Sequence, residues 1–384
     1  MSFTNKLRKL KNNFFNATAF PNNISEFRRE LESMDIQEMN YVERSFTSYR
    51  IKVKYSDLGK VAKVLKKAIY GVGFIILLPY IFSQTRPKQE MDARVIYYKI
   101  SNNKGIIPKG ILKLNPITAK MGIGFFLDDK AKAILKQSVT SSKMCVAFLF
   151  EVLFSLANYS YINARYSPEI IVTTYESSPV TSILTKYCRE NNILHYNIMH
   201  GDKFYSHVNT LGEFDVMYVW DNYYELLFRK LKYDCIKYRL FNPWNDIALP
   251  SSNSKHDFTL YLNRETNVSI KKSIEVAENL AKRGYAILVR PHPSQLEEIK
   301  EKKLISEDML ENTKDISIFQ SLANTRGVIS MYSTVLFQAS FYGKNIVIDD
   351  ITDRETFHRL KDVQYIMLNK PHTILSDIIG EKKN

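Results

Sequence analysis

Four clusters of polar residues directly follow short apolar segments of the chain, and their side chains are of types that act on phosphates and hydroxyl groups. The clusters are 175–178 (YESS), 200–203 (HGDK), 290–293 (RPHP) and 332–334 (YST). In open α/β sheets, ligands bind outside the carboxyl ends of the strands. If the apolar segments are strands of such sheets, these four clusters are the candidate functional positions.

The cluster 290–293 has the composition of a phosphate-binding turn. Prolines on both sides of His292 hold the backbone near a φ of about −65°, which limits the freedom of the imidazole. Arg290 presents a planar fork of donors that suits a phosphate or a carboxylate. Arg290, His292 and Pro293 are therefore predicted to contact an anionic ligand. The alternative is a turn that only ends the strand.

Ser333 and Thr334 stand at the start of a predicted helix, 333–342. The first turn of a helix has free amide donors, and its dipole favours an anion by roughly 0.3 to 1 kcal/mol. The two hydroxyls add donors, and the cluster 290–293 belongs to the same predicted sheet, so both point to one crevice. The alternative is that Ser333 or Thr334 only caps the helix.

Glu176, His200 and Asp202 are the candidates for a general base. An imidazole titrates near pH 6.5, so His200, with Asp202 beside it, can accept a proton at working pH. Glu176 lies beside two serines at a predicted helix start, where its carboxylate is hydrogen-bonded and ionised. The structural alternatives are a histidine satisfied within the fold and a glutamate that complements a helix dipole. The residues alone do not choose among the three.

Several familiar signatures are missing from the sequence. It contains no GxxxxGK[ST] loop, no GxGxxG, no HExxH and no GxSxG, which removes the main support for kinase, dinucleotide-binding, zinc-protease and serine-hydrolase classes. Only three cysteines occur, Cys145, Cys188 and Cys235, so a disulfide framework or a zinc knuckle is not expected. We predict that the protein requires no metal and no cofactor.

The charge of the chain favours an anionic partner. The formal net charge is +14 over 384 residues, and 45% of the residues are hydrophobic, which is ordinary globular composition. The positive charge is spread along the chain and no nucleic-acid module is recognised, so a nucleic-acid partner is not predicted. The segment Met1–Lys11 leads into asparagines rather than an apolar core, so we expect no signal peptide and a cytoplasmic location.

A basic stretch, 50–67, stands directly before the most apolar run of the chain, 69–82. The run is shorter than the roughly 20 residues that a spanning helix needs. We interpret it as a buried strand or helix, or as a membrane-facing patch. Together the two segments suggest peripheral contact with anionic lipids of the inner leaflet, but a solvated helix face leading into a core element is the favoured interpretation, because charged runs usually face water.

The positions of the four clusters depend on a regular alternation of strands and helices. Strands are predicted at 169–174, 193–199, 214–220, 258–262, 285–289, 327–330 and 345–348, with helices between them at 180–190, 222–232, 269–283 and 333–342. The turn-rich stretch 242–256 is the best linker. We therefore predict two Rossmann-like, doubly wound α/β domains, residues 1–245 and 255–384, facing a cleft; the first 165 residues show no clean periodicity.

From residue 169 to residue 350 the chain resembles bacterial GT-B transferases that build surface polysaccharides. The resemblance is carried by HG after a first-domain strand, the linker, R-x-HP, and Y-S-T followed by LFxA. Two groups share these features: the sialyltransferases with HP and S-[ST] motifs, and the CDP-glycerol glycerophosphotransferases with HG, HP and Ser-Ser elements. The resemblance implies the GT-B architecture, with an acceptor-binding first domain and a nucleotide-donor-binding second domain.

The resemblance also implies roles for single residues. His292 would contact the phosphate of a cytidine nucleotide and assist the leaving group, and Ser333 and Thr334 would bind the same phosphate. The sialyltransferases take their base from an acidic D/E-D/E-G triplet, which this sequence lacks. The base therefore stays open among Glu176, His200 and Asp202, with His200 favoured if the glycerophosphotransferase pattern is the closer one.

The expected function is transfer of a sugar onto a cell-surface glycan or lipid-linked acceptor, such as a capsule, an O-antigen or a lipooligosaccharide. CMP-sialic acid is the first donor predicted. A CDP-glycerol-type polyol-phosphate donor is the alternative, followed by other nucleotide sugars. The non-enzymatic alternative is a protein that only binds an anionic surface.

Overall fold

The structure is a computed structural model that describes residues 20–56, 59–100, 104–119, 124–251, 254–263 and 267–380. The segment Met1–Lys11, on which the signal-peptide expectation rests, lies outside the described residues. The chain divides into two compact units between Pro243 and Trp244, within the stretch expected to be a linker. We call them the first unit and the second unit and describe each by itself.

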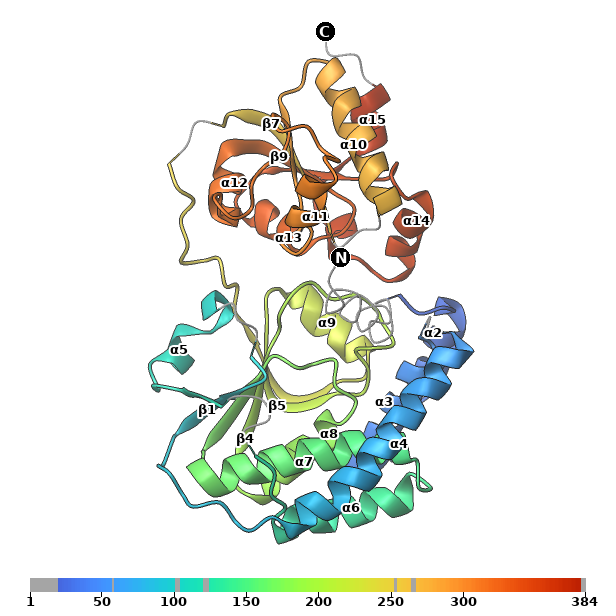
Figure 1. Ribbon diagram of the computed structural model, residues 1–384, viewed down its shortest axis with the longest axis vertical. Helices are drawn as coiled ribbons and strands as arrows, with labels where there is room; N and C mark the ends of the chain where they lie inside the picture. The colour runs from blue at the N-terminus through green and yellow to red at the C-terminus, as the bar shows by residue number, and fades with distance from the viewer. Residues whose placement is uncertain are drawn as a thin grey trace. The chain divides into compact units, whose positions relative to one another are not determined.

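The first unit is built on a six-stranded, wholly parallel sheet with the strand order β2-β1-β3-β4-β5-β6 (Figure 1). Every residue of β5 is buried, as expected for an inner strand of a sheet covered on both faces. The strands are β1 (Val95–Tyr98), β2 (Ile117–Ala119), β3 (Ile170–Thr173), β4 (Leu194–Ile198), β5 (Glu213–Val219) and β6 (Asp234–Leu240).

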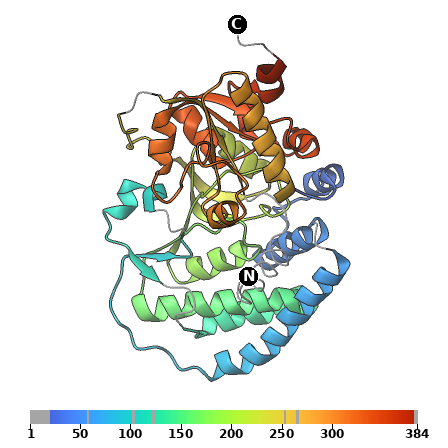
Figure 2. The ribbon, with the colours of Figure 1, turned by 45° about the horizontal axis from the view of Figure 1, so that its top comes forward.

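Helices cover the first sheet, and the longest of the buried ones, α7, forms the centre of its core. Among the described residues α7 is the one helix long and apolar enough to cross a membrane, but 67% of its most apolar window is buried within the unit. α4 lies against α7 (Figure 1, Figure 2). The helices are α2 (Ile24–Glu32), α3 (Tyr41–Lys54), α4 (Lys60–Ser83), α5 (Lys109–Leu112), α6 (Asp129–Ser141), α7 (Val146–Tyr166), α8 (Thr181–Glu190) and α9 (Asn222–Lys230).

The second unit contains a five-stranded parallel sheet with the order β11-β10-β9-β7-β8. Its strands are β7 (His256–Tyr261), β8 (Ile287–Arg290), β9 (Thr325–Ser330), β10 (Asn345–Ile348) and β11 (Thr373–Ile374). Its helices are α10 (Asn267–Lys282), α11 (Leu296–Glu301), α12 (Ile318–Asn324), α13 (Thr334–Phe341), α14 (Arg354–Asp362) and α15 (Leu375–Gly380). The prediction of two α/β domains with parallel sheets is confirmed.

Each sheet has one place where the strand order reverses. In the first unit the chain runs from β1 outward to β2 and then returns to β3 on the other side of β1; in the second unit it runs from β7 to β8 and returns to β9. Doubly wound sheets bind ligands outside the carboxyl ends of the strands at such a reversal. The topology therefore selects the ends of β1 and β3, and of β7 and β9, as ligand positions.

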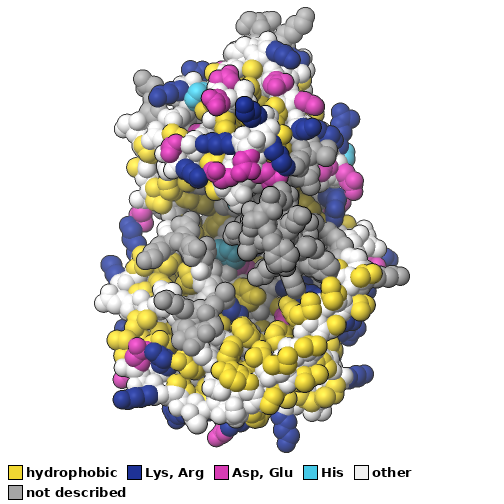
Figure 3. Space-filling view, in the orientation of Figure 1, with side chains coloured by type: hydrophobic (Ala, Val, Ile, Leu, Met, Phe, Trp, Pro, Cys, Tyr) yellow, Lys and Arg dark blue, Asp and Glu magenta, His cyan; other side chains and the backbone are white. Residues whose placement is uncertain are grey.

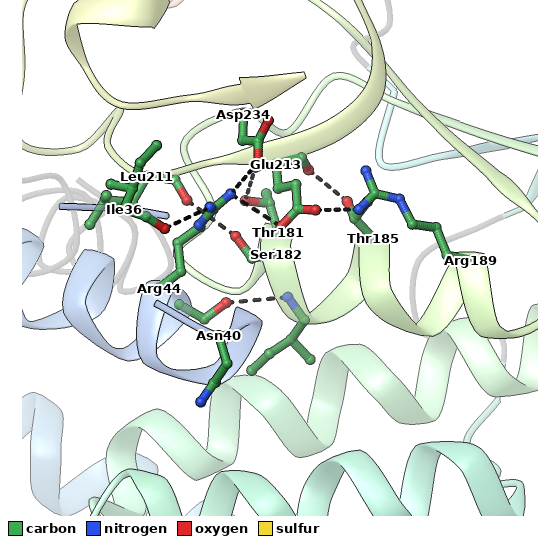
Figure 4. A network of polar contacts seen from close by, with 12 residues as sticks. Ile36, Asn40, Arg44, Thr181, Ser182, Thr185, Arg189, Leu211, Glu213 and Asp234 are labelled. Carbon is green, nitrogen blue, oxygen red and sulfur yellow. Dashed lines mark hydrogen bonds and ion pairs between the residues drawn. The ribbon is translucent and has the colours of Figure 1, made fainter. Parts of the chain in front are cut away.

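A buried polar network closes the opposite, amino-terminal edge of the first sheet (Figure 4). Arg44 of α3 contacts Asp234 at 2.9 Å and Glu213 at 3.4 Å, where β6 and β5 begin. Arg189 of α8 contacts the same Glu213 and also Asp215, at 2.5 and 2.8 Å. Burial raises the pKa of Glu213 despite the two guanidinium groups. This network attaches α3 and α8 to the sheet. None of its residues follows the carboxyl end of a strand, where ligands are expected to bind.

The strands and helices predicted from residue 169 onward are present, with ends that differ from the prediction by at most two residues. Strand β6 was not predicted, because most of its residues are exposed and its sequence does not alternate cleanly. The apolar run 69–82 belongs to one helix, α4, that begins at Lys60 and contains Pro79. The run is therefore helical, but the interpretation of it as a buried element is wrong, because Val72, Ile75 and Ile76 are each more than half exposed. The basic stretch 50–67 is divided between the end of α3 and the first turns of α4.

Candidate functional site

The first-unit site is a pair formed by Glu176 and His200. Glu176 follows β3, His200 follows β4, and these neighbouring parallel strands end at the same edge of the sheet. His200 Nδ1 lies 3.1 Å from Glu176 Oε1 and 3.2 Å from Oε2. Glu176 is buried, whereas 42% of the His200 side chain is exposed. A buried carboxylate therefore holds a solvent-accessible imidazole.

Charged and polar neighbours keep the Glu176 carboxylate ionised. Lys203 Nζ lies 2.6 Å from Oε1, and Asn197 Nδ2 donates to Oε2 at 3.3 Å. Burial by itself would raise the pKa of Glu176, but the charges of Lys203 and His200 outweigh it and hold the pKa well below its usual range. An ionised Glu176 accepts a hydrogen bond from Nδ1–H of His200, so the lone pair of the neutral imidazole lies on Nε2.

Backbone geometry fixes the loop after β4. Gly201 has a φ of +69°, a left-handed conformation that favours glycine. The turn brings Lys203 back under the histidine, so that its Nζ donates to the His200 carbonyl at 2.7 Å. The turn thus favours glycine at position 201, and it positions His200.

Asp202 points away from the pair. Its Oδ1 accepts from Tyr224 Oη at 2.6 Å and from the Lys203 amide at 2.8 Å. Burial raises the pKa of Asp202 to about 6, although these hydrogen bonds oppose the shift. The expectation that Asp202 assists His200 is therefore corrected: Glu176 is the carboxylate that contacts the imidazole, because β3 and β4 are adjacent and end side by side.

Lys99 is a site residue that the sequence analysis missed. It follows β1 at the reversal of strand order, and its ammonium group lies 4.4 Å from the centre of the Tyr175 ring. Its backbone is left-handed, with a φ of +51°. Burial lowers the pKa of Lys99 to about 8. From α3, Lys52 Nζ donates to the Ser177 carbonyl at 3.0 Å. Burial also lowers the pKa of Lys52. Two lysine side chains thus contact the loop 175–178.

In the second unit, Arg290 is engaged within the protein. Its guanidinium donates to Glu311 Oε2 at 2.5 Å and to the Ile316 carbonyl at 2.9 Å, and the residue is buried. The predicted fork toward a ligand phosphate is therefore directed at a carboxylate of the protein. We assign Arg290 to positioning the end of β8, because an arginine buried beside a carboxylate is strongly held there.

His292 is half-buried and is oriented by the residue two positions later. Its Nδ1 lies 2.7 Å from Ser294 Oγ and accepts from the Ser294 amide at 3.2 Å. A neutral imidazole that accepts at Nδ1 carries its proton on Nε2, which makes Nε2 a donor. Pro293, beside it, is exposed. This orientation allows Nε2 of His292 to donate a hydrogen bond to an anion, as the sequence predicts.

Ser333 caps α13, with its side chain accepting from the Val335 amide at 3.4 Å. Its own amide donates to Tyr365 Oη at 3.3 Å. Asn263, which follows β7, donates through Nδ2 to the Tyr332 carbonyl, so residues after β7 and β9 meet at the strand reversal. Thr334 is the first residue of α13. β7 separates β8 from β9, so His292 and Thr334 share the edge at a spacing of roughly two strands, about 10 Å.

Within the described part of the chain, no three histidine, cysteine, aspartate or glutamate side chains are grouped so as to hold a metal ion. The sequence pattern indicated His200, Glu176 and the HG turn as candidate site residues. It did not indicate Asn197, which sits inside β4, or Lys99, which lies where no periodicity is visible. A basic residue after a short β-branched and aromatic run, VIYY, was the one available signal for Lys99.

No protein-family model and no curated protein matches the chain. Among solved structures, the chain is similar to the wall teichoic acid polymerase TagF. A histidine-to-alanine variant of TagF aligns with a TM-score of 0.44 and 12% identity, over 83% of this chain and 88% of that chain. A histidine-to-asparagine variant soaked with CDPG aligns with a TM-score of 0.43 and 13% identity, over 85% and 88%. These values assign no role to any residue here.

Proposed function

We propose that the protein is a transferase of the GT-B type that moves a polyol phosphate from a CDP-linked donor to a hydroxyl group of an anionic surface polymer. The observation that carries the proposal is the contact between Glu176 and His200 Nδ1. It supplies a histidine base in the first unit, at the HG element that the glycerophosphotransferases share. Transfer from CMP-sialic acid, the donor first expected, calls for an acidic triplet that the sequence lacks.

The chemistry of such a transfer suits the residues of the first unit. The acceptor oxygen forms a bond to the phosphorus that bears the polyol, the bond from that phosphorus to CMP breaks, and CMP leaves with the electron pair. The hydroxyl proton passes to Nε2 of His200, and Glu176 stabilises the imidazolium that results. The cations Lys52 and Lys99 beside the loop 175–178 favour a negatively charged acceptor.

The second unit is proposed to bind the nucleotide. His292 Nε2 would donate to a donor phosphate, and the first turn of α13, with Thr334, would offer amides at the reversal between β7 and β9. Ser333 contributes as the cap of that helix and Arg290 by holding the strand end. No metal is required in this proposal, because imidazole and helix-terminal donors meet the developing charge on the leaving CMP.

The first experiment is calorimetric binding of CDP, CMP, UDP and GDP, with and without Mg²⁺, to the wild type, His292→Ala and His372→Ala. His372 is an exposed histidine of the same unit and serves as the matched control. Loss of one charge-assisted hydrogen bond corresponds to weakening of about 10- to 150-fold, so we expect His292→Ala to weaken CDP by this factor and His372→Ala to leave it unchanged.

The outcomes separate the alternatives. Preferred, metal-independent binding of CDP, together with CMP release from CDP-glycerol, supports the proposal. Preference for CMP restores the sialyl-type donor, and preference for UDP or GDP indicates a different nucleotide sugar. If none of the nucleotides binds, the non-enzymatic alternative, binding of an anionic surface, replaces the transferase.

A further inference from the structure

Helix α4 (Lys60–Ser83) exposes a continuous apolar face on the first unit (Figure 3). At its centre, Val72, Ile75 and Ile76 are 58%, 69% and 63% exposed. Ordinary soluble proteins seldom leave so large a group of apolar side chains open on one surface. The members of this group, which we call the α4 face, are Val61, Val64, Leu65, Ile69, Val72, Ile75, Ile76, Tyr80 and Phe82.

The α4 face is one side of the helix, and the other side is attached to the protein. At 100° per residue the members of the α4 face fall within about 160° of arc. On the opposite side, Ile81 is buried, and the ring of Tyr70 lies 5.0 Å from that of Phe150 of α7. A side chain at Gly73 would collide with the same Phe150, whose Cε2 lies 2.7 Å from the position of a Cβ. α4 is thus packed closely against α7 and cannot turn its apolar face inward.

The charge of α4 distinguishes between possible occupants of this face. The helix contains four lysines and no acidic residue. Lys66 and Lys67 lie on either side of the apolar arc, and the ammonium of Lys66 is 5.4 Å from the centre of the Tyr70 ring. A second copy of α4 would bring lysines opposite lysines with no carboxylate of the helix to pair them. Anionic lipid headgroups above an apolar layer match both the cations and the apolar face.

We propose that the α4 face is a membrane-docking surface, which lies in the plane of an anionic bilayer with its apolar side chains among the acyl chains. The attachment to α7 keeps the helix parallel to the surface of the unit, so it rests on the bilayer and does not cross it. Tyr80 and Phe82 extend the face to its carboxyl end, where aromatic side chains suit the headgroup boundary. The proposal is independent of the transferase activity, because docking requires neither donor nor acceptor.

The test is co-sedimentation of the whole chain with phosphatidylglycerol-containing vesicles and with vesicles of phosphatidylcholine alone. The apolar variant Val72→Ser/Ile75→Gln/Ile76→Gln should lower the apparent affinity on the order of tenfold or more. The matched control is Leu226→Gln/Ile236→Gln, two apolar residues of the same unit that are 60% and 75% exposed but lie away from α4. It should sediment as the wild type does.

A second pair of measurements addresses the charge. Lys66→Gln/Lys67→Gln should weaken binding to the anionic vesicles on the order of tenfold, and added salt should do the same to the wild type. Circular dichroism and thermal unfolding establish that each variant is folded. Analytical ultracentrifugation without vesicles measures self-association of the wild type and the apolar variant.

Three results would overturn the proposal. One is that the wild type does not sediment with the anionic vesicles. Another is that the apolar variant binds them as strongly as the control variant. The third is that the wild type is an oligomer that the apolar variant converts to monomers, since a second copy would then cover the α4 face. Loss of nucleotide binding or of CMP release in these variants would bear on the proposed function and not on docking.

Discussion

The buried residue Glu176 determines which ring nitrogen of His200 can accept a proton. Glu176 is buried and ionised, so it accepts a hydrogen bond from Nδ1–H of His200, and the lone pair of the neutral ring lies on Nε2. Lys203 balances the charge of Glu176, because its Nζ lies 2.6 Å from Oε1. A neutral side chain in place of Glu176 would leave Lys203 without its carboxylate and the imidazole without its orientation.

We expect His200→Ala to lower CMP release from CDP-glycerol by about 10²- to 10⁴-fold, the usual contribution of a general base. Calorimetric binding of CDP should stay unchanged, because the nucleotide is assigned to the second unit. His358→Ala, which removes an exposed histidine from the second unit, serves as control and should change neither quantity. Near-normal turnover of His200→Ala would remove the histidine base from the proposal.

Asp202 should make stability depend on pH. Its pKa in the folded chain is raised to about 6 from an ordinary value of 3.8. The protonated form is thus favoured by folding, so the stability it contributes is complete below about pH 4 and is lost as the pH rises through 6. Urea unfolding of Asp202→Asn and wild type at pH 4 to 7 should show the variant gaining about 1 to 3 kcal/mol relative to the wild type over this interval. A constant difference would contradict the raised pKa.

At the scale of elements, the short turn after β4 determines where His200 lies. Gly201 is left-handed with a φ of +69°, and Gly284, in the turn after α10, is left-handed with a φ of +84°. The two positions thus share a backbone requirement and differ in location, and a Cβ at Gly284 would meet no atom within 4 Å. They form a matched pair for separating strain from function.

Gly201→Ala and Gly284→Ala should each lower the free energy of unfolding by about 1 to 2 kcal/mol, the cost of a left-handed alanine. Only Gly201→Ala should also reduce CMP release, because only that turn carries His200 and Lys203. Urea unfolding and the release assay measure the two effects. Equal loss of activity in both variants would show that strain alone, and not the placement of His200, accounts for the change.

At the scale of the whole molecule, the proposed function gives the two units different roles, so they should respond to separate changes. The network of Arg44, Arg189 and Glu213 lies at the amino-terminal edge of the first sheet (Figure 4). Glu176 and His200 follow β3 and β4 at the opposite edge. It joins α3 and α8 to β5 and β6. Removing one partner leaves the buried Glu213 carboxylate with less compensation.

Arg44→Leu should destabilise the first unit by about 3 kcal/mol while CDP binding by the second unit is retained. Since burial already raises the pKa of Glu213, the loss should be smaller at pH 4, where the carboxyl group is protonated more easily, than at pH 7. The control is Arg326→Leu, which breaks an exposed pair with Asp257 and should cost less than about 1 kcal/mol. Scanning calorimetry with and without CDP assigns each transition to a unit.

The sequence by itself determined the alternation of strands and helices after residue 169, because buried parallel strands are continuous apolar runs and their helices have clear periodicity. It also placed HG, HP and the α13 start after strands. The secondary structure of the first third could not be predicted, because β1 is only four residues long and α4 is apolar on two sides. Those two sides face different surroundings, α7 on one and the surface on the other, which no one-dimensional period distinguishes.

Only the tertiary structure decided which charged groups act together. Glu176 and His200 are far apart in the chain but meet because β3 and β4 are neighbours, whereas Asp202, two residues from His200, is turned toward Tyr224. Arg290 has the residue type of a phosphate ligand, but its guanidinium forms an ion pair with Glu311 of the protein. Residue type and local spacing identify groups capable of chemistry; strand order and burial select their partners, because the charge of a group depends on its neighbours in space.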